Sequence, residues 1–188
     1  MSVPGLLLTG GASSRMGVPK ATLERDGETL ANRAARLLQV VCDPVVEIGP
    51  GYTALTRVPE DPPGRGPLAA LVAGADALGC AGPVVLLACD LPFVTEALLA
   101  RLAGWPGSDS VVPVDRDGVL QPVCARYSPD ALDHARELLG AGERSFRALL
   151  RGPGVTRLDD VDERELVDVD TPAEALEWGI RVPDSLEP

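Results

Sequence analysis

The sequence predicts a three-layer α/β/α sandwich around a mainly parallel sheet. Short apolar runs alternate with amphipathic or alanine-rich segments along the whole chain, a pattern typical of strands alternating with helices. Residues 83–89, PVVLLAC, are continuously apolar, as a central parallel strand covered on both faces requires. No long linker and no internal repeat interrupts the 188 residues, so we expect one domain over residues 1–188.

Each expected element follows from the local pattern. Apolar or β-branched runs bounded by Gly, Pro or polar residues predict strands at 3–9, 44–48, 54–58, 83–89, 110–114, 120–127 and 166–169. Amphipathic or alanine- and leucine-rich segments predict helices at 28–41, 67–78, 94–102, 129–139 and 145–150. Thr171 is expected to cap a last helix, with Pro172 at its first position.

Composition argues against a membrane protein and against secretion. Hydrophobic residues make up 45% of the chain, but no run approaches the roughly 20 apolar residues of a membrane-spanning helix. The start, MSVPGLLLTGG, has no basic segment before its apolar run, so we expect a cytoplasmic protein. The four cysteines form no CxxC pair and the single histidine, His134, lies in a helical stretch, so buried thiols are expected rather than a zinc site.

The net charge of −11 argues against a nucleic-acid partner, because binding a phosphate backbone needs clustered positive charge. Small anionic substrates remain compatible if local cations, backbone N–H groups or a metal offset the field of the protein. Open α/β sheets bind ligands beyond the carboxyl ends of their strands, so the residues that follow each predicted strand are the candidates for a site.

The first candidate is the loop in LLLTGGASSRMGVPK. Gly10 and Gly11 allow a tight turn that brings bare N–H groups against phosphate oxygens, while Arg15 and Lys20 add positive charge. The spacing does not fit a GxxxxGK[ST] loop, since Ala21 follows the lysine, nor the GxGxxG pattern, since the two glycines are adjacent. We interpret the loop as an anion cradle of another kind.

Two residues in these positions have candidate roles in catalysis. Lys20 is the only lysine, and a compact ammonium kept at one position favours a task such as neutralising the α- and β-phosphates; the alternative is a solvated loop lysine. Asp90 ends the apolar strand at 83–89, where a carboxylate is expected to meet a metal, a cation or backbone donors. Its oxygens suit Mg²⁺, and the alternative is a cap of the following helix.

Five motifs together resemble those of one family, in order and across almost the whole chain. They are LLLTGGASSRMGVPK, PEDPPGRGPLAAL, LLACDLPF, QPVCARY and DVDTPAE. This set is similar to that of the GT-A-like nucleotidyltransferases with a Rossmann-like sheet, and within them to the molybdenum cofactor guanylyltransferases (molybdopterin-guanine dinucleotide biosynthesis protein A family). The resemblance implies transfer of GMP from GTP to molybdopterin, forming the guanine dinucleotide cofactor and pyrophosphate.

The resemblance also implies roles for particular residues. Nucleotide binding is expected at Leu8, Thr9, Gly10, Gly11, Lys20, Asp61, Gly66, Pro67, Leu68 and Asp90. Asp90 would hold Mg²⁺, and Asp90, Lys20 and Arg15 would be the catalytic residues. The acceptor phosphate is already anionic, so alignment and electrostatics would suffice without a side-chain nucleophile. GTP and molybdopterin are the expected partners, with transient contacts to enzymes that deliver or accept the cofactor.

Departures from the family pattern leave the base open. Thr9 replaces the usual Ala, and Gly49 or Pro50 stands where an Asn often helps to hold the base. The GG loop and GPLAAL favour guanine. The alternative is a cytidylyltransferase acting on molybdopterin or another small phosphate, and a further alternative is a non-catalytic nucleotide-binding relative.

Asp168 and Asp170 replace paired asparagines of the family. Two residues apart on a strand, they would share one face, and two carboxylates beside the phosphates repel each other unless a cation lies between them. We therefore expect at least one of them to join Asp90 around Mg²⁺. The alternative is that Asp170 only caps the helix begun by Thr171, while Asp168 is solvated.

Overall fold

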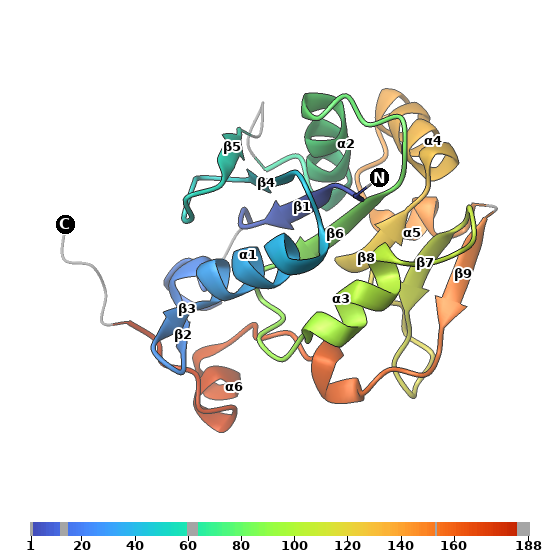
Figure 1. The fold of residues 1–188 in the computed structure, drawn as a ribbon. Coiled ribbons are helices and arrows are strands. Elements are labelled where there is room, and N and C mark those ends of the chain that lie inside the picture. Colours follow the sequence, from blue (N-terminus) through green and yellow to red (C-terminus); the bar gives the residue numbers. More distant parts are fainter. Residues whose placement is uncertain (1, 12–14, 60–63, 153, 184–188) are drawn as a thin grey trace.

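The computed structural model describes residues 2–11, 15–59, 64–152 and 154–183. Its strands are β1 (Gly5–Leu8), β2 (Glu24–Arg25), β3 (Glu28–Thr29), β4 (Val45–Ile48), β5 (Thr56–Val58), β6 (Val84–Ala88), β7 (Ser110–Pro113), β8 (Cys124–Tyr127) and β9 (Val155–Leu158). Seven of them form one sheet in the order β5-β4-β1-β6-β8-β7-β9, and β2 pairs with β3 in a small hairpin (Figure 1).

Helices cover both faces of the sheet. One core layer packs α1 (Leu30–Val41) and α3 (Glu96–Ala103) against the sheet, and the other packs α2 (Pro67–Ala77), α4 (Pro129–Gly140) and α5 (Phe146–Leu149) (Figure 1). The chain also contains α6 (Pro172–Glu177) and the 3-10 helices η1 (Lys20–Thr22) and η2 (Glu163–Leu166). The three-layer α/β/α prediction is confirmed.

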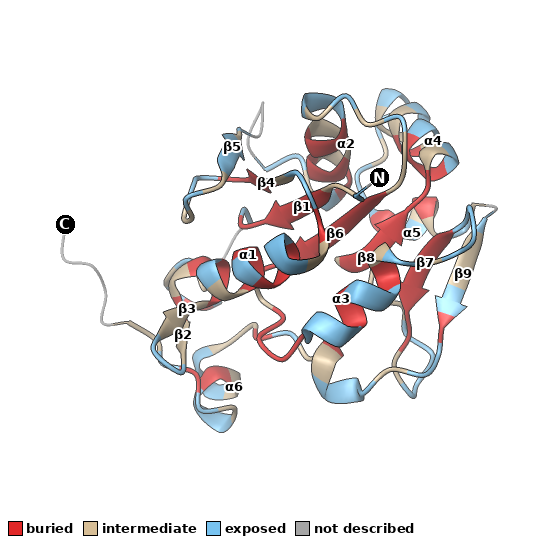
Figure 2. Ribbon diagram, viewed as in Figure 1, coloured by how far each residue is buried: buried red, intermediate tan, exposed pale blue. Residues whose placement is uncertain are grey.

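The central strands explain why their sequences are continuously apolar. In β6, Val85 and Leu87 face the layer of α1 and α3, whereas Leu86 and Ala88 face the layer of α2 and α4. Every residue of β1 and β6 is buried, so neither strand has a polar face (Figure 2).

The pairing of β1 and β6 determines where a site can form. The two strands run parallel with Leu8 opposite Ala88, so the segments that follow them leave the sheet side by side. The sheet is mainly parallel, but β8 runs antiparallel to both β6 and β7. As a result the residue before β8, Val123, lies at this same end of the sheet, where its carbonyl accepts from the Ala88 N–H at 2.7 Å.

Two strand predictions were wrong in detail. Residues 166–169 do not form a strand: Leu166 ends η2, and the following residues are extended without pairing in the sheet. Within 120–127 only Cys124–Tyr127 is a strand, although Leu120 forms an isolated bridge with Val114. The strand β9 was not predicted, because three of its four residues are not buried and no apolar run marks them.

A separate small core attaches the end of the described chain to the first loop. Met16, Leu23 and Leu30 pack there with Val169, Ala175 and Ile180. The backbones of Glu24 and Arg181 exchange two hydrogen bonds of 2.9 and 2.7 Å. This packing places the segment before α6 beside the loop that carries Lys20.

The other expectations from composition can be compared directly. All four cysteines are free, and Cys42, Cys89 and Cys124 are buried. Burial raises the pKa of Cys42 and of Cys124 to about 12, so neither thiol is reactive at neutral pH. In the part of the chain that the structure describes, no helix is both long and apolar enough to span a membrane.

Candidate active site

Two adjoining cavities lie at the carboxyl ends of β1 and β6. The smaller has a volume of about 290 Å³ and the larger about 730 Å³, and they share Leu8, Gly10, Gly11 and Pro67. The smaller cavity is the polar one. It is lined by Leu8, Thr9, Gly10, Gly11, Arg15, Lys20, Pro67, Ala88, Cys89, Asp90, Val123 and Asp170.

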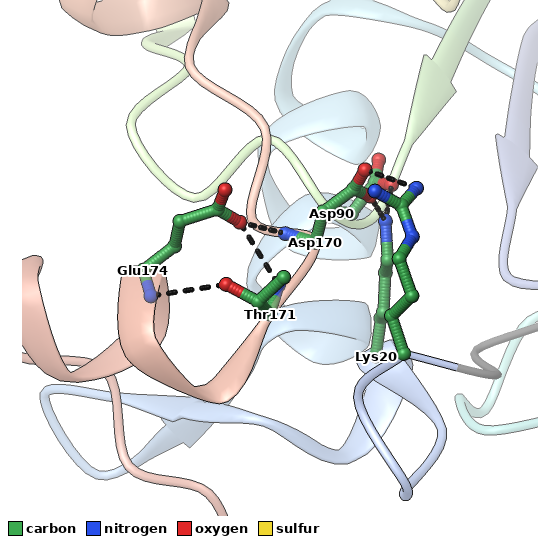
Figure 3. A network of polar contacts seen from close by, with 6 residues as sticks. Lys20, Asp90, Asp170, Thr171 and Glu174 are labelled. Atoms are coloured by element: carbon green, nitrogen blue, oxygen red, sulfur yellow. Dashed lines mark hydrogen bonds and ion pairs between the residues drawn. The ribbon is translucent and has the colours of Figure 1, made fainter.

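The smaller cavity contains an ionic cluster. Lys20 Nζ donates to Asp90 Oδ2 at 2.8 Å and also to Asp170 Oδ1 (Figure 3). Arg15 Nη2 lies 2.5 Å from Asp170 Oδ2. Burial alone would lower the pKa of Lys20, but Asp90 and Asp170 outweigh it and the pKa is raised. The hydrogen bond from Lys20 lowers the pKa of Asp170. Lys20 and Asp170 are therefore charged at neutral pH, and the solvated-loop alternative for Lys20 is wrong, because its ammonium is half-buried between two carboxylates.

The local sequence explains how Asp170 reaches this cluster. Thr171 caps α6 in a capping box: its hydroxyl accepts from the Glu174 N–H, while the Glu174 carboxylate accepts from the N–H groups of Thr171 and Asp170 at 2.9 and 2.8 Å (Figure 3). The Val169 N–H donates to the Asp90 carbonyl at 3.2 Å. Thr171 is thus the cap, and the side chain of Asp170 is directed to Lys20 and Arg15 instead.

The carboxylates fit a metal ion. Asp90 does not cap α3, because Thr95 does so, and its Oδ1 is buried without a hydrogen-bond partner in the described residues. Such an oxygen is suited to a cation. Within the described ranges no three His, Cys, Asp or Glu side chains form a complete metal cage. Mg²⁺ takes one or two carboxylates and completes its shell with water and phosphate oxygens.

Asp168 lies near the same charges. Burial of its carboxyl and the neighbouring charges of Asp170 and Asp90 raise the pKa of Asp168. The expectation that Asp168 and Asp170 share a strand face fails, because residues 167–170 are not a strand. Asp168 still interacts with Asp90, and Asp170 binds the same ammonium of Lys20 as Asp90 does.

The turn that was expected to lie near the nucleoside lines the larger cavity. Gly66 and Pro67 line it at the start of α2, beside Leu8, Gly10 and Gly11. Gly66 has φ +91° as the N-cap of α2, a conformation that favours glycine. Leu68 requires a correction: its side chain is fully buried in the core beneath α2 and lines neither cavity. The prediction for Asp61 lies outside the described residues.

A buried carboxylate that the sequence prediction did not include joins Thr9, which lines the smaller cavity, to the loop after β4. Glu47, in β4, is fully buried, and its two oxygens accept hydrogen bonds from Thr9 Oγ1 at 2.5 Å, from the N–H groups of Gly51, Tyr52 and Thr53, and from Thr53 Oγ1. Burial opposes its ionisation, but these donors outweigh burial and the pKa of Glu47 is lowered. The only signal in the sequence is one charge in the apolar run VVEI.

Thr9 and Gly49 lie in close contact in this arrangement. A Cβ on Gly49 would lie 2.5 Å from Thr9 Oγ1 and 2.7 Å from the Gly10 nitrogen, so only glycine fits there. The two departures noted from the sequence, a threonine in the first loop and a glycine after β4, therefore belong to one contact. The glycine loop and residues 49–53 are held together by Glu47.

Comparisons with known proteins find relatives along most of the chain. The MobA-like NTP transferase domain family matches residues 5–161. A probable molybdenum cofactor guanylyltransferase from Chloroflexus aggregans is 32% identical over 92% of this chain and 91% of its own length. One from Mycobacterium tuberculosis is 36% identical over 90% of this chain and 89% of its own length.

Solved structures share the fold at low identity. Molybdopterin-guanine dinucleotide biosynthesis protein A from Archaeoglobus fulgidus superposes with a TM-score of 0.77 at 19% identity, covering 93% of this chain and 96% of that one. The 2-C-methyl-D-erythritol 4-phosphate cytidylyltransferase from Thermus thermophilus gives 0.66 at 17% identity, covering 94% and 96%. The fold alone therefore does not select the base. The family match over most of the chain, together with relatives above 30% identity, shows that this chain belongs to the MobA-like NTP transferases.

Proposed function

We propose that this protein transfers GMP from GTP to molybdopterin, forming the guanine dinucleotide cofactor and releasing pyrophosphate. One observation carries the proposal: the Lys20–Asp90 pair lies in a polar cavity that opens beside the double glycine into a larger, mostly apolar cavity. The first suits phosphates and the second a nucleoside. Two relatives that align over about nine tenths of this chain are described as probable molybdenum cofactor guanylyltransferases.

The chemistry uses the charges already present. The acceptor phosphate oxygen forms a bond to the α-phosphorus of GTP, and the bond from that phosphorus to the bridging oxygen of the β-phosphate breaks. Lys20 and Arg15, which both bind Asp170 in the structure, would turn to the triphosphate and stabilise the charge that builds up on its oxygens. Asp90, with Asp170 or Asp168, would hold Mg²⁺, which supplies Lewis-acid stabilisation of the phosphate oxygens.

The wider assignment follows from this reaction. We propose that residues 1–188 act as one nucleotidyltransferase domain in the cytoplasm, where nucleoside triphosphates are available. GTP and molybdopterin are its small-molecule substrates, and contacts with cofactor-delivering or cofactor-accepting enzymes are transient. The acidic chain, with a net charge of −11, favours small ligands, bound where Lys20, Arg15 and backbone N–H groups offset the field of the protein, over nucleic acid.

The test is release of pyrophosphate from each NTP in the presence of Mg²⁺ and molybdopterin. GTP should give the highest kcat/KM, because hydrogen-bonded recognition leaves buried polar groups unpaired when the wrong base enters. A higher value with CTP would establish the cytidylyltransferase alternative. Nucleotide binding without pyrophosphate release from any NTP would establish the non-catalytic one. Asp90→Asn serves as the inactive control, because it keeps the shape of the side chain and removes its charge.

A further inference from the structure

The larger cavity has only one polar side chain among the described residues that line it. Its walls are formed by Leu8, Gly10, Gly11, Gly49, Pro50, Arg57, Gly64, Gly66, Pro67 and Ala70. At about 730 Å³ it is large enough for a nucleoside. Glycine, proline and aliphatic residues can contact a base through their backbone or by packing, so Arg57 is the described side chain that can read its edge by hydrogen bonding.

Arg57 is held in place at this cavity. It lies in the middle of β5, the edge strand, and its Nε donates to the Gly49 carbonyl at 2.9 Å. Its Cδ would lie 3.1 Å from a Cβ on Gly51, so the aliphatic stem packs closely over that glycine. With Nε occupied, the two Nη groups make no hydrogen bond or ion pair with the described residues. They keep donors for a ligand.

The loop that positions Arg57 is itself fixed. Glu47 accepts from the N–H groups of Gly51 and Tyr52 at 3.1 and 2.7 Å. Because Glu47 is fully buried and also accepts from Thr9 Oγ1 at 2.5 Å, the carbonyl that holds Arg57 is tied to the glycine loop. The guanidinium is therefore preorganised relative to the strand end where the phosphates are expected.

A guanidinium offers only donors, which selects among bases. Guanine presents two adjacent acceptors, O6 and N7, and the paired contact of arginine with them is the commonest specific contact to a base edge. Adenine presents N7 beside an N6 donor group, and cytosine presents an N4 donor on the corresponding edge. Building on the proposed guanylyltransferase function, we propose that Arg57 determines base specificity by donating to O6 and N7 of the guanine.

The test uses base analogues that remove one acceptor at a time. Wild-type protein should bind 7-deaza-GTP, which lacks N7, about tenfold more weakly than GTP, from the typical value of a bidentate base contact. In Arg57→Ala this difference should fall to about twofold or less. ITP keeps O6 and N7 but lacks the N2 amino group, so the ratio of ITP to GTP affinity should be the same in both proteins. Dissociation constants measured without acceptor are the readout.

Two variants separate recognition from charge and from folding. Arg116→Ala removes the same charge from a residue that lines neither cavity, and it should leave the GTP and 7-deaza-GTP affinities unchanged. Arg57→Lys keeps the charge without the planar fork and should restore the discrimination only in part. Melting temperatures of all variants establish that they fold.

Three outcomes would overturn the inference. Discrimination against 7-deaza-GTP that persists in Arg57→Ala would show that another group reads N7. If Arg57→Ala lost affinity equally for GTP, 7-deaza-GTP and ATP, Arg57 would contribute only its positive charge and would not recognise the base. Transfer of CMP in preference to GMP by the wild-type protein would overturn the proposed function itself. This outcome is distinguishable from the other two because it is observed without any Arg57 variant.

Discussion

Replacing Lys20 by methionine should make the nucleotide-free protein bind divalent metal more tightly while it abolishes transfer. The ammonium of Lys20 lies between the carboxylates of Asp90 and Asp170, the oxygens proposed to hold Mg²⁺. Before nucleotide arrives, lysine and metal therefore compete for the same charges. Methionine keeps much of the length and apolar surface of the stem and removes only the competing charge.

The size of the effect follows from Coulomb's law. Two unit charges about 4 Å apart interact by about 1 kcal/mol even at the dielectric constant of water, and a divalent ion doubles this. About 2 kcal/mol corresponds to a roughly thirtyfold lower Kd. The Lys20 side chain is 19% exposed, so the surroundings are less polarisable than bulk water and screening by salt is incomplete. A decrease in Kd of tenfold or more is expected at low ionic strength.

Mn²⁺ binding followed by electron paramagnetic resonance, without nucleotide, is the assay. Arg116→Met is the matched control for net charge, and its Kd for Mn²⁺ should stay within about twofold of wild type because Arg116 lines neither cavity and its side chain is largely exposed, where salt screens its charge. A Lys20→Met protein that binds Mn²⁺ no better than wild type would refute the competition. Pyrophosphate release should be lost in the same variant, and Lys20→Arg should rescue it only in part.

Three further predictions concern the carboxylates. Asp90→Asn should abolish turnover with little change in unfolding free energy, and near-normal rates with Mg²⁺ would remove Asp90 from the mechanism. Asp168→Asn and Asp170→Asn, titrated with Mg²⁺ in the presence of GTP, test whether a second carboxylate binds the metal. If neither variant has a lower affinity for Mg²⁺ than wild type, Asp90 is the only one of the three aspartates that binds it. Glu47→Gln should lower the unfolding free energy by about 2–4 kcal/mol at pH 7, since an amide nitrogen then faces buried donors. Because the folded-state pKa of Glu47 is lowered, its contribution is complete above the unfolded value of about 4.5 and is lost as pH falls through the lower folded value, so the wild-type advantage in urea unfolding should shrink below pH 4.5.

The fold could be predicted where the sequence of a single helix or strand is enough to indicate its structure. The run in β6 is apolar because both of its faces are covered, and the capping box at Thr171 is complete within four residues. The direction of β8 could not be predicted, because a buried strand has the same composition whether it runs parallel or antiparallel. The strand β9 is largely uncovered at the sheet edge, so no periodicity distinguishes it from a loop.

The site could be predicted in part for the same reason. The rule that ligands bind beyond strand ends pointed to Lys20 and Asp90, since each follows a predicted strand or its loop and both strands form. It pointed to Asp170 through a strand at 166–169 that does not form. Their ion pairs join residues up to 150 positions apart and depend on tertiary structure. The pairing of Glu47 with Thr9 leaves no periodic signal, because a buried charge is defined by its partners and those partners are mostly backbone N–H groups.

The charges at the site link the two ligands of the proposed reaction. In the structure, Lys20 and Arg15 pair with Asp170, and Lys20 also pairs with Asp90. When both cations turn to a triphosphate, the two carboxylates lose their partners at the moment that more negative charge enters the cavity. A divalent ion at Asp90 and Asp170 restores the balance, so nucleotide and metal should each raise the affinity for the other by the same factor. An aspartate at position 170 strengthens this linkage in a way that an asparagine cannot, because an amide carries no charge to be released.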